Sequence, residues 1–161
     1  MFTQKHLLIA AVAMSALSAL SAQAQTLKPT IDLNTAKAIA QGCEDASKRE
    51  GWKMNIAVMD TGGNLVHFTH MDDAYILSIR IAQLKAQTSA QSPLPTRTYR
   101  EYSKSAIGLE LIPNTTTIAG GLPIMNSKGQ QLGGVGVSGG SEDQDENCAK
   151  AGLEAAKALL K

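Results

Sequence analysis

The stretch of sequence that is most informative about the fold reads GGLP at residues 120–123, QLGGVGVSGG at residues 131–140 and SEDQDE at residues 141–146. Glycines at this density mark backbone that takes a positive φ or lies very close to another group. We therefore expect strands whose glycines leave room for a ligand to approach, beside an interior that is partly hollow. Ser141 and Gln144 have the spacing of a capping box, which predicts a helix that begins here and runs to the C-terminus.

Outward from this stretch, the chain alternates between helical and strand patterns. Apolar residues at helical spacing follow Asn34, a predicted N-cap, and continue to Gly51. Alternation with period two on both sides of a glycine-containing turn then indicates a β-hairpin. The next helix is so apolar that we expect it to be largely buried. The complete prediction has helices at residues 34–51, 74–89, 96–104 and 141–160, and strands at residues 54–60, 65–69, 118–125 and 131–138.

This order of elements, without repeats, low-complexity segments or linkers, indicates a single α+β domain in which helices pack on an antiparallel sheet. Residues 1–24 are excluded from it. They begin with basic residues, continue with an apolar stretch and end in AQA at residues 22–24. This is the pattern of a secretory signal peptide. We therefore expect a domain at residues 25–161 that is periplasmic or secreted and has no membrane insertion after cleavage.

The charge of the chain is balanced, with 14 Lys and Arg against 14 Asp and Glu once Lys5 is removed. A protein that binds nucleic acid needs a basic patch or stripe that contacts phosphates. The sequence has none, which argues against nucleic acid as a partner.

Two cysteines, Cys43 and Cys148, lie on the first and the last predicted helix. In an oxidising compartment a disulfide between them would persist if the two helices are neighbours. Small buried thiols that fill two helix faces are an equally good interpretation. The sequence leaves both open.

Two familiar motifs occur in the glycine-rich stretch, and both fail in their context. Gly134, Gly136 and Gly139 match the dinucleotide-binding fingerprint, but this fingerprint needs a parallel strand and a later acidic ribose ligand, and the acidic helix start would repel a pyrophosphate. Ser138 lies in a GxSxG pattern, but a hydrolase of that type needs a histidine after its acid, and none occurs beyond His70. We therefore expect neither activity.

The histidines His67 and His70 are the only ones outside the predicted signal peptide. Their odd separation places them on opposite faces of a continuous strand, so they cannot bind one ion together. Either alone could ligate a haem iron, or simply form ordinary hydrogen bonds. His70 is the better candidate because Met71 and Asp72 follow it at the strand end, where functional residues tend to gather.

Charged residues elsewhere supply further candidates. Arg80 and Lys85 project from the most apolar helix, where a cation needs an exit to solvent or a carboxylate, so one of them is expected to face a pocket and hold an anionic ligand group. A side chain that merely reaches solvent is the alternative. The acidic run at residues 142–146 complements the helix dipole, and Asp145 is kept from it as a candidate ligand-binding residue.

In order and spacing, several of these pieces resemble the GlcG/HbpS family, which is related to the C-terminal domain of PduO. The pieces are IAVMDTGGNLV at residues 56–66, MDDA at 71–74 with Lys85 downstream, GGLP at 120–123, GGVGVSG at 133–139 and QDE at 144–146. The resemblance implies a profilin-like fold with a five-stranded antiparallel sheet flanked by helices. It also implies a homo-oligomer, haem binding in exported members and, as a candidate partner, a membrane sensor. This chain has His70 where the family usually has Arg.

Three functions remain open at this point. The leading hypothesis is an exported protein that binds haem or a related tetrapyrrole without catalysis of its own. His70 would ligate the iron, with His67 less favoured, Lys85 or Arg80 would pair with the propionates, and the backbone at Gly120 and Gly121 would let the ring approach. The second is an enzyme, or an enzyme accessory, for a small carboxylic acid held by Asp72, Lys85, Gly121 and Asp145. The third is an oligomeric sensor module that acts through protein contacts.

Overall fold

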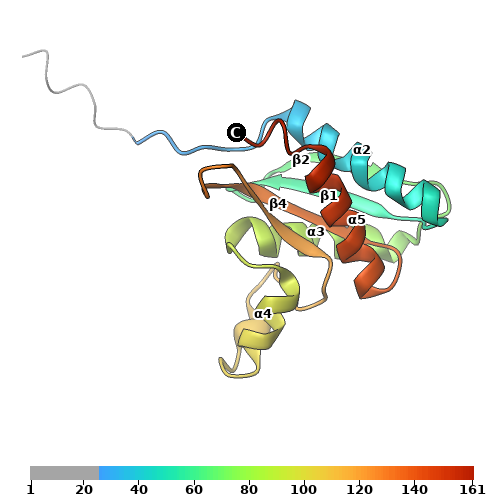
Figure 1. Cartoon of the computed structure of the whole chain (residues 1–161). Helices are drawn as coiled ribbons and strands as arrows, with labels where there is room; N and C mark the ends of the chain where they lie inside the picture. Colours follow the sequence, from blue (N-terminus) through green and yellow to red (C-terminus); the bar gives the residue numbers. More distant parts are fainter. Residues whose placement is uncertain (1–25) are drawn as a thin grey trace, which may run out of the picture.

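The computed structural model describes residues 26–161, so the predicted signal peptide at residues 1–24 lies outside the described residues. This part of the chain forms an α+β domain with a four-stranded antiparallel sheet (Figure 1). Its helices are α2 (Leu33–Glu50), α3 (Ile76–Gln91), α4 (Thr96–Ser103) and α5 (Glu142–Ala155), and a short 3-10 helix spans Leu109–Leu111. Its strands are β1 (Asn55–Asp60), β2 (Leu65–His70), β3 (Gly121–Met125) and β4 (Gln131–Ser138).

The strand order in the sheet is β2-β1-β4-β3, and helices cover both faces. Alternate residues of β1 show this: Ile56 and Val58 point into the main core with α2 and α5, whereas Ala57 and Met59 pack against α3. The predicted hairpins and the order helix, hairpin, helix, hairpin, helix are thus confirmed. The fifth strand that the family resemblance implied is wrong for the described residues, because the chain between α4 and β3 forms a 3-10 helix and irregular turns instead.

The glycines of β3 and β4 serve the contact with α3. A Cβ added to Gly134 or Gly136 would collide with the backbone of α3, at Ala86 and Ala90 or at Ala82 and Ala86. The prediction of a close approach is therefore confirmed, but the group that approaches is a helix. The expectation of a hollow beside these strands is wrong for the single chain, because α3 fills that space.

The prediction that α3 is largely buried is only partly right. Its small residues face the sheet, since only they fit against strands without side chains, and they are buried: Ser78, Ala82, Ala86, Ser89 and Ala90. Its large apolar residues Ile76 and Leu77 are exposed. The helix thus has the reverse of the usual arrangement, with large side chains outside.

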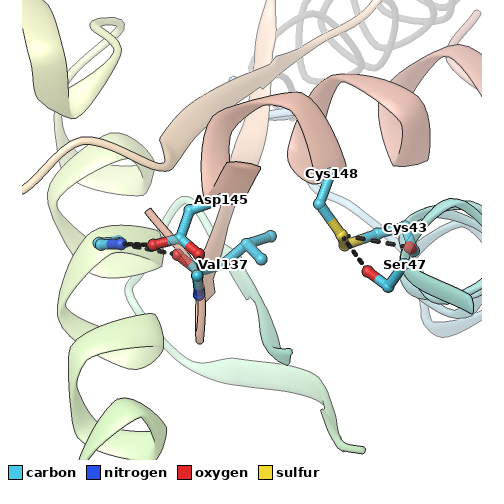
Figure 2. Close-up of a disulfide and its surroundings, with 7 residues drawn as sticks. Cys43, Ser47, Val137, Asp145 and Cys148 are labelled. Atoms are coloured by element: carbon cyan, nitrogen blue, oxygen red, sulfur yellow. Dashed lines mark hydrogen bonds and ion pairs between the residues drawn. A yellow bond between two sulfur atoms is a disulfide. The ribbon is translucent and has the colours of Figure 1, made fainter. Parts of the chain in front are cut away.

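Helices α2 and α5 lie side by side on the other face of the sheet, joined by a disulfide between Cys43 and Cys148 (Figure 2). Their close contact depends on glycines, because a Cβ on Gly152 would collide with the carbonyl oxygen of Ile39. The Cα atoms of the two cysteines are 4.6 Å apart. The alternative of two free buried thiols is therefore wrong.

Two predicted helix ends are also corrected. The N-cap of α2 is Asp32 rather than Asn34, since the Thr35 amide donates a 2.7 Å hydrogen bond to the Asp32 carboxylate. Helix α5 ends at Ala155 and does not run to the C-terminus. Beyond it the chain turns so that Leu160 is buried and its carbonyl accepts a hydrogen bond from the Ser127 amide.

Candidate functional site

His70 is the last residue of β2, an edge strand, and its ring is fixed by the neighbouring strand β1. Its Nδ1 lies 2.6 Å from the Oδ1 of Asn55, the residue directly opposite it in the sheet. Asn55 is fully buried, and its Nδ2 donates to the backbone carbonyl of Tyr75 at 3.0 Å. The buried amide therefore holds the imidazole against the start of α3.

These contacts determine which ring nitrogen of neutral His70 carries the proton. The carbonyl of Tyr75 can only accept, so Nδ2 of Asn55 faces it and Oδ1 faces the histidine. Because Oδ1 is an acceptor, Nδ1 of His70 must be the donor. The lone pair of neutral His70 is then on Nε2, on an exposed side chain. Histidines that bind metals in proteins commonly have this arrangement, with the second nitrogen donating to an oxygen.

The surface around His70 is hollowed by two neighbouring depressions. The first, of about 270 Å³, is lined by Lys53, His70 and the residues Glu44, Lys48, Thr69, Met71 and Asp72. The second, of about 320 Å³, includes Trp52, Lys53 and Tyr75, together with the backbone of Gly139 and Gly140. Lys53 borders both, so the depression with the imidazole of His70 adjoins the one with the aromatic side chains of Trp52 and Tyr75.

The cations of this surface differ in availability. Lys48 is paired with Glu44 at 2.6 Å. Lys53 is exposed and has no ion pair within residues 26–161. Lys53 is therefore the cation that an anionic ligand group would meet first. Sequence analysis missed it, although its position directly before β1 and next to Trp52 was a usable signal.

The neighbours of His70 have other roles as well. Met71 is nearly buried and belongs to the main core, so its thioether is mostly used in packing. Asp72 is exposed and borders the first depression. His67 lies opposite Val58 on the α2 side of β2, where its Nε2 is 3.2 Å from the hydroxyl of Thr69. Partial burial, together with the charge of Lys37, lowers the pKa of His67.

Lys85 and Asp145 meet in a different place, at the ends of β3 and β4 (Figure 2). Nζ of Lys85 is 2.7 Å from Oδ2 of Asp145 and donates a second bond, at 2.8 Å, to the carbonyl of Val137. Asp145 also accepts from the Gly140 amide at 2.9 Å. Burial lowers the pKa of Lys85 and raises the pKa of Asp145, because both charges have lost their water, although each partner opposes the shift of the other.

This ion pair explains the glycine at position 120. Gly120 has a φ of 116°, and a Cβ there would lie 2.7 Å from the Cβ of Asp145 and 2.9 Å from Nζ of Lys85. The amide of Gly121 is bonded to the hydroxyl of Thr96 on α4. Lys85, Asp145, Gly120 and Gly121 are thus brought together, but they contact one another and leave no room for a ligand in this structure. Asp72, which the second hypothesis added to them, lies beside His70 instead.

Arg80, the other predicted ligand cation, is exposed on α3 and donates to the side chain of Asn114 at 3.0 Å. It does not line either depression around His70. The predicted residues therefore fall into three places: the surface at His70, Met71 and Asp72, the buried pair at Lys85 and Asp145, and Arg80 alone.

The family model described as "Haem degrading protein HbpS-like" matches residues 31–154. The chain belongs to this family. It is similar to protein GlcG of Escherichia coli K12, with 38% identity over 101 residues, which cover 62% of this chain and 74% of GlcG.

Solved structures show the same architecture. A double mutant of HbpS from Streptomyces reticuli superposes with a TM-score of 0.78 at 31% identity, over 86% of this chain and 92% of HbpS. A PduOC:heme complex superposes with a TM-score of 0.72 at 23% identity, over 78% of this chain and 94% of PduOC, which shows a shared fold.

Two features are absent from the described residues, 26–161. No group of three or more His, Cys, Asp and Glu side chains is arranged to hold a metal ion. No helix there is both long and apolar enough for a membrane span.

Proposed function

We propose that the protein is an exported haem-binding protein in which Nε2 of His70 ligates the iron. The observation that carries this proposal is the hydrogen bond from His70 Nδ1 to the buried Asn55, which leaves Nε2 as a directed lone pair on an exposed ring. Imidazole is a usual ligand of haem iron. A single histidine is enough for haem, because the porphyrin supplies the four equatorial ligands.

The surface beside His70 provides further groups that suit haem. Lys53 offers an unpaired ammonium to a propionate, and Trp52 and Tyr75 offer aromatic edges to the ring. Each depression is at the lower end of the usual size of small-molecule pockets, so one subunit would cover only part of the porphyrin. The family description and the haem complex of PduOC support this ligand class.

We further propose that the protein carries haem without catalysis of its own. The side chains of Lys85 and Asp145 have shifted pKa values, but they are bonded to each other and to the backbone, and both are buried out of reach of a ligand. An acid or base that cannot reach a substrate cannot transfer its proton. This also weakens the alternative of an enzyme for small carboxylic acids.

The test is a titration of the purified protein with hemin, followed by visible absorption. The wild type should give a saturable Soret band, His70→Ala should lose the imidazole-ligated spectrum, and His67→Ala should keep it. Replacing Asn55, which orients the ligand, should weaken binding by roughly 10–100-fold. Equal spectra for His70→Ala and wild type would reject the proposal. Loss of the Soret band during aerobic incubation with a reductant would instead indicate degradation, as the family description suggests.

A further inference from the structure

A haem iron held by His70 has one further axial position, on the side of the ring that faces away from the imidazole. The porphyrin supplies four ligands in one plane, and Nε2 of His70 supplies the fifth from one side of that plane. A side chain that fills the sixth position must stand across the ring and point back toward His70. The places of the possible donors in the fold decide whether one of them can do this.

Histidine and methionine are the side chains that most often complete such a site, and here both are on the wrong side. His67 lies opposite Val58 on the α2 side of β2, where its Nε2 contacts the hydroxyl of Thr69. Met71 follows His70 directly in the chain and is packed in the main core. A residue next to His70 is anchored on the same side of a bound ring as His70 itself, so it cannot reach the other side.

The other donors near His70 are also excluded by their contacts. The two cysteines are joined in the disulfide, so residues 26–161 contain no thiolate. Lys48 is paired with Glu44. Lys53 and Tyr75 border the second depression, beside His70 on the same surface, so they approach a bound ring from its rim. A protonated lysine, moreover, has no lone pair to give to a metal.

The hydrogen bond behind His70 determines what kind of ligand the imidazole is. Nδ1 of His70 donates to the side-chain oxygen of Asn55, which is a neutral acceptor. A carboxylate in that place would form a charge-assisted bond, about twice as strong, and would make the imidazole a more basic ligand that favours ferric iron. Because the amide does this less, the site is suited to ferrous iron, the state that binds carbon monoxide.

We propose that the iron held by His70 keeps its sixth position free of protein ligands, and that in the ferrous state this position binds an uncharged diatomic molecule such as carbon monoxide. The inference rests on the haem site proposed above and adds a second ligand to it. Binding needs no further reactant, because the diatomic molecule donates a lone pair to the iron and displaces at most a water. The protein would then be a receptor for a dissolved gas as well as a carrier of haem.

The first test is the spin state of the purified protein loaded with one equivalent of hemin. Visible absorption and electron paramagnetic resonance should show high-spin iron in the ferric form. After reduction with dithionite, the spectrum should have the single broad band of a five-coordinate ferrous haem. The sharp paired bands of a six-coordinate, low-spin iron in the wild type would overturn the inference.

The second test is the rate at which carbon monoxide rebinds to the reduced protein after flash photolysis. If the sixth position is free, the observed rate should rise in proportion to the concentration of carbon monoxide. If a side chain fills the position, that side chain must leave first, and the rate levels off at the rate of its departure. Such a plateau in the wild type would overturn the inference.

Four variants test the excluded donors one at a time: His67→Ala, Met71→Leu, Lys53→Met and Tyr75→Phe. Each removes one donor group and leaves His70 in place, and Met71→Leu also conserves the volume of the core side chain. All four should keep the high-spin spectrum and the proportional rate of the wild type. A changed spin state or a changed rate law in a variant whose thermal melt shows it to be folded would reveal that residue as an iron ligand and overturn the inference.

The outcomes separate this inference from the haem site on which it rests. Equal spectra for His70→Ala and the wild type reject the haem site itself. A low-spin wild type whose spectrum changes in His70→Ala keeps the haem site and rejects the free position. A low-spin spectrum that appears only at high protein concentration would show that a second copy supplies the sixth ligand, and this too would overturn the inference.

Discussion

Asp145 and Cys148, one turn apart on α5, tie this helix to different layers of the fold. Asp145 forms an ion pair with Lys85 of α3, which covers the opposite face of the sheet from α5. Cys148 is bonded to Cys43 of α2, which lies on the same face as α5 (Figure 2). One turn of α5 therefore connects all three long helices. Both links are buried, so removing one partner of either should cost more stability than removing one partner of an exposed contact.

Breaking the ion pair on one side should be strongly destabilising. Lys85→Met leaves the carboxylate of Asp145 buried without its partner, for which we expect a loss of about 3–5 kcal/mol in the free energy of unfolding. Lys85→Met combined with Asp145→Leu removes both charges and should recover a large part of this loss. Urea unfolding at neutral pH measures both. Equal losses in the single and the double variant would contradict a charge-based cause.

Adding one methyl group to β4 should separate α3 from the sheet. In Gly136→Ala the new Cβ meets backbone atoms of Ala82 and Ala86, which cannot turn aside as a side chain can. We expect a loss of about 1–3 kcal/mol or more from overpacking. In the control, Gly62→Ala, the Cβ meets only side-chain atoms of Asn64 and Asp60 in an exposed turn. Urea midpoints for the two variants should differ clearly.

The disulfide should stabilise the chain mainly by restricting the unfolded state. It joins residues 105 positions apart, and loss of such a bridge typically costs roughly 2–5 kcal/mol. Reduction should therefore lower the urea midpoint of the wild type. A variant with Cys43→Ala and Cys148→Ala should already have the lower midpoint and show no response to reductant. A reductant effect of equal size in that variant would show that the loss has another origin.

Features of the fold that follow from a few neighbouring residues were predictable from the sequence, and features that depend on contacts between distant segments were not. The hairpin at residues 54–70 and the strand at 131–138 follow from alternation and glycine turns within a few residues, and both were predicted nearly to the residue. The direction in which α3 faces was not predictable, because its polar residues are distributed all around the helix and leave no distinct polar side to orient it. Only the glycines of the opposing strands decide that its small residues turn inward.

The candidate site was predictable to a similar extent. His70 stood out as one of two histidines, and the register of β2 places His67 on the other face as expected. Asn55 could not be assigned to it, since it meets His70 through strand pairing rather than through nearness in sequence. Lys53 was missed as well, although its position directly before β1 was a usable signal. Lys85 and Asp145 were singled out as candidate ligand-binding residues, and the structure pairs them with each other. Their partnership across 60 residues, which uses up both charges, could not be inferred from a single sequence.

Acid should release the arm that contains α4 (residues 96–103) before the sheet unfolds. Figure 1 shows α4 standing away from the sheet. Arg100 of α4 donates to both carboxylate oxygens of Glu142 on α5, at 2.8 and 3.0 Å. Arg97 forms ion pairs with Asp143 and Glu146 of the same helix α5. The bonds from Arg100 lower the pKa of Glu142 below its ordinary value of 4.5.

A lowered carboxyl pKa means that the undocked form binds more protons between the lowered value and about 4.5. The stabilisation that Glu142 gives to the docking of α4 on α5 is therefore fully present above pH 4.5. It is lost as the pH falls through the lowered pKa of Glu142. The Glu142 side chain is about one-third exposed, so the expected loss is small, below about 1 kcal/mol.

Hydrogen exchange of the α4 amides, compared with those of β4, separates this local release from global unfolding. In the wild type, protection of α4 relative to β4 should fall as the pH is lowered from 5 toward 3, after correction for the intrinsic exchange rate. Glu142→Gln should have the lower α4 protection already at pH 5 and a flatter pH profile. Glu101→Gln is the control, because Glu101 forms its ion pair with Lys104, in the segment right after α4, and not with α5. If this control shows the same flattening, the acid response belongs to the helix itself and not to its docking on α5.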